Sequence, residues 1–559
     1  MQELTRLQNE RVILMGNEAI VRGALESGVQ FVSTYPGTPA SEIGNLFSEI
    51  AKNNDSIYFE FSTNEKTALE AAIGASFSGL KCLVAMKNFG MNVALESLIP
   101  FGYTGSKGAT VIIVADDPSC HSSAQSEENS RGFAYLSHIP VLEPSDAQEC
   151  LEFVRLGFQI SKRFHLPVIV RTTTRVAHQK AVVQTSGLPK VRPSDAEFIK
   201  DKHRFVTMPP RVMEMHQELL DKISIIKLFV EDSDVNYVYG DLSTNTNTKR
   251  AGIITSGVAY LHVLEALRML GKDVPVLKLG FFYPLPEQKI KDFIKPLKKV
   301  LIVEELDPYL EKEVAALAKS ANPKLVIYGK NILPETGEMN PEIVAGAVAA
   351  VVRKKYVVPQ SMVEGVKHFP RFCSGAATCP YWRVFAAIKK AVPENTVFGG
   401  DIGCYMIAAL PPHNLYDYMF CMGSSIGIGH GIAKATNGQQ KVVTLIGDGT
   451  FFHSGIEALL NAVYNQSNLL AIIVDNRITA MTGHQPNPGM GKAAETDAAP
   501  EIKIEEVARA LGVKNIKIVD PVDGFDELVT SIQEYYPKNE ISVIIAKRIC
   551  ALLEKRQKQ

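Results

Sequence analysis

The chain has 559 residues, a formal net charge of −1 at pH 7 and 46% hydrophobic residues. At about 150 residues per domain, this length corresponds to roughly three or four domains, each large enough to bury its own core. The balanced charge offers no basic face for nucleic acid, and the apolar runs are far too short to span a bilayer. The N-terminus lacks the apolar core of a signal peptide, so we expect a cytoplasmic protein that binds neither nucleic acid nor membrane.

Short β-branched runs alternate with helical stretches over residues 1–180, which is the pattern of a parallel sheet covered on both faces. The expected strands are RVILMG, FVSTYPG, IYFEF, CLVAM, ATVIIVAD, PVLEP and PVIVRT. Residues 181–249 lack this alternation and are rich in Lys, Asp, Met and Pro, so we expect a partly helical linker there.

Two further α/β blocks follow the linker. Residues 250–352 contain AGIITSG, VPVLKLG, KVLIVEE and KLVIYG, and residues 353–372 form a second connector. Residues 373–559 contain NTVFGGD, YMFCMG, KVVTLIGDG, LLAIIVDN, NIKIVDP and ISVIIAK. The expected fold class is α/β, with three doubly wound parallel-sheet domains.

The strongest motif lies in the third block, where GDG at 447–449 is followed, after 25 residues, by DN at 475–476. Asp448 and Asn476 each come at the end of an apolar strand, so their side chains should emerge at the edge where ligands collect in open α/β folds. Their oxygens, with the backbone carbonyl of Ile478, suit Mg²⁺, and the glycines allow a diphosphate to approach the backbone closely. This spacing resembles the fingerprint of enzymes that bind thiamine diphosphate (ThDP).

Longer stretches carry a more specific resemblance. GDGTFFHSGIEALLNAVYN, IIVDNRITAMTGHQPNPG, YPGTPASE, STNEKTALEAAIGAS and CMGSSIGIGHG are similar to the alpha subunit of indolepyruvate:ferredoxin oxidoreductases, and the similarity extends to about Leu553. The resemblance implies a ThDP pyrimidine-binding domain over residues 1–180, a transketolase C-terminal-like domain over 250–352 and a diphosphate-binding domain over 373–559.

The resemblance also implies roles for single residues. Glu65 becomes the carboxylate that activates the pyrimidine ring, whereas position alone would make it an exposed carboxylate at a helix start, with Glu60 and Glu70 as competitors. Thr38 becomes a donor to the substrate carboxylate, and His484 serves substrate or proton transfer unless it is only a hydrogen-bonded loop residue. The other residues expected to bind the cofactor or its metal are Tyr35, Pro36, Gly37, Asp401, Gly403, Cys404, Gly423, Ser424, Ser425, Gly447, Asp448, Gly449, Thr450, Asn476 and Ile478. The expected metal ligands among them are Asp448, Asn476 and Ile478.

Two features depart from that family. Its alpha subunits usually continue into a ferredoxin-like domain with clustered cysteines, whereas this chain ends at KRICALLEKRQKQ and none of its eight cysteines forms a CxxC pair. We therefore expect reduced, mostly buried thiols and no iron–sulfur cluster in this chain. At 373–383, CSGAATCPYWR replaces a tighter CPGCPHR, so that Tyr381 and Trp382 stand where the family has a histidine. Trp382 either shapes the substrate pocket or packs at a helix start.

The activity that the resemblance implies is oxidative decarboxylation of an aryl or branched-chain 2-oxoacid, such as indolepyruvate, to an acyl-coenzyme A. The implied assembly is a homodimer core with a smaller gamma-type (beta) subunit and a ferredoxin-like carrier for the electrons. Two alternatives stay open: a non-oxidative ThDP enzyme, either a 2-oxoacid decarboxylase or a carboligase, and a non-catalytic assembly subunit.

Overall fold

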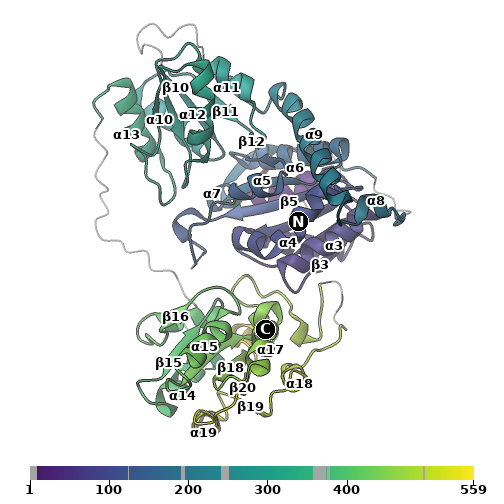
Figure 1. Cartoon of the computed structure of the whole chain (residues 1–559), viewed down its shortest axis with the longest axis vertical. Helices are drawn as coiled ribbons and strands as arrows, with labels where there is room; N and C mark the ends of the chain where they lie inside the picture. Colours follow the sequence, from purple (N-terminus) through teal and green to yellow (C-terminus); the bar gives the residue numbers. More distant parts are fainter. Residues whose placement is uncertain are drawn as a thin grey trace. The chain divides into compact units, whose positions relative to one another are not determined.

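The computed structural model describes residues 5, 9–123, 125–190, 196–240, 251–356, 373, 378–494, 496 and 498–558. The chain divides into two compact units, Met1–Glu364 and Gly365–Gln559 (Figure 1). Within the described residues, no helix combines the length and the apolar character needed to cross a bilayer.

A seven-stranded sheet forms the core of the N-terminal part of the first unit, in the order β12-β6-β7-β5-β4-β2-β3. Its strands are β2 (Phe31–Thr34), β3 (Tyr58–Phe61), β4 (Cys82–Lys87), β5 (Thr110–Asp116), β6 (Val141–Leu142), β7 (Val168–Thr173) and β12 (Phe281–Tyr283). Neighbours run parallel except β12, which pairs antiparallel with β6. Every residue of β5 is buried, as expected of a central strand covered on both faces. The accompanying helices are α1 (Gly16–Glu26), α2 (Ser41–Ala51), α3 (Glu65–Phe77), α4 (Asn88–Thr104), α5 (Gly132–Ser137), α6 (Ala147–Phe164) and α7 (Thr174–His178).

The first predicted strand lies outside this sheet. RVILM forms β1 (Arg11–Met15), which pairs antiparallel with β8 (Lys180–Gln184) in a separate ribbon, so its expected place in the parallel sheet is wrong. The reason is its one-sided burial: Ile13 is 63% exposed, whereas Val12 and Leu14 are buried. The region expected as a linker contains the end of β8, then α8 (Lys202–Phe205), α9 (Arg211–Glu231) and β9 (Tyr237–Tyr239).

The second sheet of this unit has the order β14-β13-β10-β11-β9. Its remaining strands are β10 (Ala251–Ser256), β11 (Val276–Leu279), β13 (Lys299–Val303) and β14 (Val326–Tyr328), and its helices are α10 (Ala259–Leu270), α11 (Glu287–Ile294), α12 (Tyr309–Ala321) and α13 (Pro341–Val352). Ile253 packs in a cluster with α10 and α13, whereas the next residue, Ile254, packs with α11 and α12. Successive residues of β10 thus serve opposite faces, and helices cover both.

The C-terminal unit contains a parallel six-stranded sheet in the order β16-β15-β17-β18-β20-β19. The strands are β15 (Val397–Gly400), β16 (Tyr418–Met419), β17 (Val442–Gly447), β18 (Leu470–Asp475), β19 (Asn515–Val519) and β20 (Ser542–Lys547). The helices are α14 (Pro380–Ala391), α15 (Ser424–Ala435), α16 (Asp448–Thr450), α17 (Ile456–Tyr464), α18 (Ile504–Ala510), α19 (Phe525–Tyr535) and α20 (Ala551–Gln557). Leu445 packs towards α14 and α19, and Ile446 towards α15 and α17. The predicted α/β class is confirmed.

The growth of this last sheet reverses at β15, because β16 is added on one side of it and β17 on the other. Open α/β sheets bind ligands in the crevice beyond the carboxyl ends of the strands at such a reversal. Asp401 follows β15 and Asp448 follows β17, so the motif residues of the third block lie at this point of the sheet.

Candidate functional site

The two ends of the GDG and DN motif lie side by side in the C-terminal unit. β17 and β18 are neighbouring parallel strands, with Gly447 in register with Val474. Asp448 and Asn476 therefore follow adjacent strand ends, and both side chains are buried. The expected convergence of these two residues is observed.

Three oxygen-bearing groups meet beyond these strand ends. One end of the Asn476 amide lies 2.7 Å from the carbonyl oxygen of Ile478 and 3.0 Å from Oδ1 of Asp448. A nitrogen at that end would donate a hydrogen bond to each of these oxygens, whereas an oxygen there would face both of them. In this second orientation Asn476 Oδ1 also accepts the Ile478 N–H at 3.3 Å. Neighbouring ligands of an octahedral Mg²⁺ with bonds of roughly 2.1 Å are about 3 Å apart. The spacing therefore fits a magnesium-sized cation bound by a carboxylate, an amide and a carbonyl oxygen.

Asp448 is held in place from its other side. Its Oδ2 accepts hydrogen bonds from Asn487 Nδ2 at 2.9 Å and from the Ile478 N–H at 3.2 Å, which leaves Oδ1 directed to Asn476. Burial and the nearby Asp475 carboxylate raise the pKa of Asp448 well above its ordinary value. A buried carboxylate is costly unless it is neutralised or hydrogen-bonded, and a bound cation would supply that charge. The sequence analysis gave no role to Asn487, and it named Asp475 only as part of the DN pair.

Through hydrogen bonds, the Asp401 side chain links the chain just after β15 to the N-terminus of α15. Its carboxylate accepts hydrogen bonds from the N–H groups of Gly423 at 3.0 Å and Ser425 at 3.4 Å, and from the hydroxyl of Tyr405. Burial raises the pKa of Asp401 to about 7. The side chain thus shapes the turn at the sheet reversal, and its direct contact with a cofactor stays a prediction.

The turn at Gly423 requires glycine. Its φ is +82°, and a Cβ there would lie 2.6 Å from the carbonyl oxygen of Ser454. Ser424 begins α15 and donates to the carbonyl of Cys421 at 2.6 Å. Across the crevice, the Thr450 hydroxyl donates to the carbonyl of Ile402 at 2.9 Å. The predicted residues Gly403 and Cys404 follow β15, while Gly447 ends β17 and Gly449 lies just after it.

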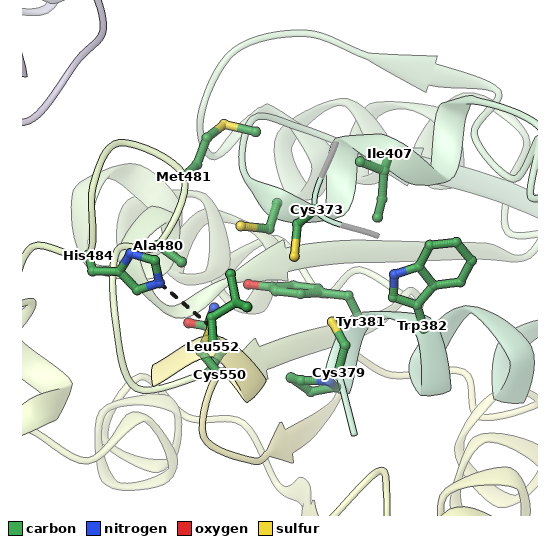
Figure 2. Close-up of a pocket in the computed structure, with 13 residues that line it drawn as sticks. Cys373, Cys379, Tyr381, Trp382, Ile407, Ala480, Met481, His484, Cys550 and Leu552 are labelled. Atoms are coloured by element: carbon green, nitrogen blue, oxygen red, sulfur yellow. Dashed lines mark hydrogen bonds between the residues drawn. The ribbon is translucent and has the colours of Figure 1, made fainter. Parts of the chain in front are cut away.

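A cavity of about 230 Å³ opens beside Asn476 (Figure 2). Its walls include Trp382, His484 and four of the eight cysteines, namely Cys373, Cys379, Cys404 and Cys550. His484 Nε2 lies 3.9 Å from Cys550 Sγ, and burial lowers the pKa of this histidine. The gathering of these thiols could not be predicted from sequence, because they come from separate segments. Among the described residues, no three His, Cys, Asp or Glu side chains are placed to share one metal ion.

Burial, together with the neighbouring thiols, raises the pKa of Cys404 to about 12, so this thiol is protonated at neutral pH. The Trp382 ring contacts the His413 ring with centroids 4.6 Å apart, and Tyr381 stacks on Tyr405 at 5.7 Å. Trp382 therefore both packs at the start of α14 and faces the cavity, and its role in substrate choice stays a prediction. Residues 374–377 of the divergent segment lie outside the described residues.

In the N-terminal unit, Glu65 is the first residue of α3 and is buried, with 7% exposed. Gly90 of α4 packs directly on it, since a Cβ at Gly90 would lie 2.5 Å from Glu65 Cγ. The alternative of an exposed helix-start carboxylate is therefore wrong. The two competing carboxylates have other partners. Glu60 accepts a hydrogen bond from the Tyr58 hydroxyl, and Glu70 forms an ion pair with Lys66.

The loop between β2 and α2 is tied down by Asn17. The Asn17 amide donates to the carbonyl of Pro39 at 2.7 Å and to Glu42 Oε2 at 2.8 Å. Tyr35 and Pro36 are buried here, while Gly37 and Thr38 are half-buried at the carboxyl edge of the sheet. The structure thus places the predicted residues of this loop on a fixed backbone at that edge.

Two regions of the chain match known protein families. Residues 22–223 match the family described as "Pyruvate flavodoxin/ferredoxin oxidoreductase, thiamine diP-bdg", and residues 401–546 match "Thiamine pyrophosphate enzyme, C-terminal TPP binding domain". Glu65 falls in the first region, and Asp448, Asn476 and Ile478 fall in the second.

Similarity to single proteins extends over nearly the whole chain. Indolepyruvate oxidoreductase subunit IorA of Methanothermobacter thermautotrophicus is 42% identical over 558 residues, which cover 98% of this chain and 88% of that protein. The same subunit of Pyrococcus horikoshii is 40% identical over 573 residues, covering 97% and 86%. Among solved structures, the 2-oxoglutarate:ferredoxin oxidoreductase of Magnetococcus marinus has 19% identity and a TM-score of 0.48 over 61% of this chain and 65% of that one.

These similarities confirm the family expected from the motifs and the presence of ThDP-binding regions. The enzyme class follows from the same matches, since both regions belong to ThDP enzymes and the relatives are oxidoreductase subunits. The chain belongs to the indolepyruvate oxidoreductase subunit IorA family, and is a ThDP-dependent oxidoreductase of the 2-oxoacid:ferredoxin type.

Proposed function

We propose that this chain is the catalytic subunit that binds ThDP and Mg²⁺ and oxidatively decarboxylates an aryl or branched-chain 2-oxoacid to an acyl-coenzyme A. The observation that carries the proposal is the meeting of the Asp448 carboxylate, the Asn476 amide and the Ile478 carbonyl inside the region that matches ThDP-binding enzymes. The name of the relatives, indolepyruvate oxidoreductase, supports an aryl side chain on the substrate.

In this proposal Asp448 Oδ1, the Asn476 amide oxygen and the Ile478 carbonyl bind Mg²⁺, with the other positions left to diphosphate oxygens and water. Asn487 and the Ile478 N–H keep the Asp448 carboxylate in the ligating orientation. When bound, ThDP supplies the electron sink that makes decarboxylation of a 2-oxoacid possible.

Glu65 holds the pyrimidine ring through a hydrogen bond to its N1′ nitrogen. Burial of this carboxylate supports the role, because a hydrogen bond shielded from water is stronger than an exposed one. Thr38 donates to the substrate carboxylate from the loop that Asn17 fixes, and His484 serves substrate or proton transfer from the wall of the cavity.

The proposed assembly has a cytoplasmic homodimer core. A smaller gamma-type (beta) subunit and a ferredoxin-like carrier take the electrons, since oxidation requires an acceptor. The relatives are named as subunits of an oxidoreductase, which supports a partner chain.

The test is an anaerobic assay of the full chain with its gamma-type partner, ThDP, Mg²⁺ and phenylpyruvate or indolepyruvate. The proposal predicts reduction of a viologen dye that depends on added coenzyme A. Aldehyde release without any electron acceptor would instead identify a non-oxidative decarboxylase. Absence of Mg²⁺-dependent ThDP binding in calorimetry would identify a non-catalytic assembly subunit.

A further inference from the structure

Glu65 lies at the carboxyl edge of the first sheet, and this edge is called the Glu65 edge below. The arginines near it form ion pairs with carboxylates of the same chain. Arg131 forms a two-pronged ion pair with Glu143, with both distances at 2.7 Å, and Arg171 pairs with Asp116 at 2.7 Å. Arg175, in the helix after β7, pairs with Glu338. These guanidinium groups therefore have carboxylate partners within the chain.

Lys87 differs from these arginines. It is the last residue of β4, a central strand between β2 and β5, so it stands at the carboxyl edge of the sheet. Its Nζ donates to the carbonyl of Ser122 at 3.3 Å and lies 4.7 Å from the centroid of the Phe89 ring. Among the described residues, no carboxylate lies within ion-pair distance of this ammonium.

The surroundings of Lys87 connect it to the predicted site. A Cβ at Gly37 would lie 2.9 Å from Lys87 Cβ, so the loop that carries Thr38 packs on the lysine stem. Burial lowers the pKa of Lys87 to about 8, although the charges of Asp117, Glu65 and others act in the opposite direction. The ammonium is thus partly desolvated yet still mainly protonated at neutral pH. A desolvated cation of this kind is stabilised when an anion binds beside it.

We propose that Lys87 binds the carboxylate of the 2-oxoacid substrate, next to the hydroxyl of Thr38. The inference rests on the proposed function, because it takes the Glu65 edge to be where the cofactor meets the substrate. Lys87 is the cation at this edge that has no carboxylate partner among the described residues, and Glu65, Asp117 and Glu128 make the edge acidic. An anionic substrate needs a positive charge to enter such a site.

The test compares two unreactive ligands, 3-phenylpropanoate and its neutral amide 3-phenylpropanamide, by calorimetry on the full chain loaded with ThDP and Mg²⁺. Wild-type protein is expected to prefer the carboxylate, and Lys87→Met to lose roughly 10- to 100-fold of its affinity for the carboxylate while binding the amide unchanged. In the Lys87→Met variant the KM for phenylpyruvate should also rise, whereas the affinity for ThDP should stay the same.

The matched control is Lys81→Met. Lys81 immediately precedes the same strand at its opposite end, burial lowers its pKa, and its Nζ also donates to a backbone carbonyl, that of Ser27, at 2.6 Å. This variant should keep the full preference for the carboxylate. If Lys87→Met does not fold, Lys87→Gln serves instead, because its amide can still donate to the Ser122 carbonyl.

Three results would overturn the assignment. An unchanged preference in a Lys87 variant, with wild-type turnover of phenylpyruvate intact, removes Lys87 from the substrate site and leaves the proposed function standing. Loss of ThDP affinity with the preference retained places Lys87 at the diphosphate instead. A wild-type protein that neither turns over a 2-oxoacid nor binds the carboxylate more tightly than the amide removes both proposals together.

Discussion

Replacing Gly90 by alanine should misplace the Glu65 carboxylate without changing the chemistry of any side chain that binds the cofactor. The added Cβ would lie 2.5 Å from Glu65 Cγ and 2.7 Å from its Oε1, whereas ordinary contacts begin near 3.4 Å. The carboxylate or α4 must therefore move by about 1 Å. A shift of that size at a catalytic group costs on the order of 100-fold in rate, and overpacking of this kind costs about 1–3 kcal/mol of stability.

The assay is deuterium exchange at the thiazolium C2 of bound ThDP, followed by NMR, with ThDP affinity measured in parallel. Gly90→Ala should slow exchange by about 100-fold, and Glu65→Gln by at least as much, with ThDP binding largely retained. Gly74→Ala is the control, because this glycine lies on α3 with Glu65 and has nothing within 4 Å of its added Cβ. Normal exchange in Glu65→Gln would refute the assignment of Glu65 as the activating carboxylate, and normal exchange in Gly90→Ala alone would show that α4, rather than the carboxylate, moves to relieve the contact.

Three further outcomes are expected. Asp448→Ala should abolish Mg²⁺-dependent ThDP binding in calorimetry while the fold persists, and retained binding would exclude Asp448 as a ligand. Trp382→Ala should change the ratio of kcat/KM between aryl and branched 2-oxoacids if the indole faces the substrate, and an unchanged ratio would assign Trp382 to packing alone. Burial raises the pKa of Glu305 from 4.5 to about 7 in the folded protein, so its proton is lost from the unfolded chain first, and stability falls as pH rises between these values. Denaturant titrations of Glu305→Gln should show a smaller fall over that window, and an equal fall would contradict the raised pKa.

Local patterns were sufficient to predict the third block. The spacing of GDG and DN fixes two strand ends, and parallel neighbours must bring those ends to one edge, so the meeting of Asp448 and Asn476 follows from sequence. The same patterns could not predict Asn487, because its contact with Asp448 depends on how an irregular loop folds back. They also could not predict the contact of Gly90 with Glu65, which arises from the packing of α4 on α3, or the contact of the loop after β2 with the stem of Lys87.

The position of RVILM shows that an apolar run can predict a strand without predicting which sheet the strand joins. Its composition suits a strand of the parallel sheet, but its one-sided burial belongs to the antiparallel ribbon with β8. Likewise β12 lies within the second block of the sequence yet pairs with β6 at the edge of the first sheet. This long-range pairing cannot be predicted from the local alternation of apolar and polar residues. The burial of Glu65 is equally non-local, since it depends on the close packing of α3 against α4.

The proposed function depends on Asp448, Asn476 and Ile478 binding the metal ion that holds the diphosphate. Anomalous diffraction from crystals of the full chain grown with ThDP and Mn²⁺ in place of Mg²⁺ tests it most directly. We expect one manganese peak within about 2.3 Å of Asp448 Oδ1, the Asn476 amide oxygen and the Ile478 carbonyl oxygen. Bound ThDP with its metal ion elsewhere, and with the Asn476 nitrogen donating to Asp448 and Ile478, would contradict it.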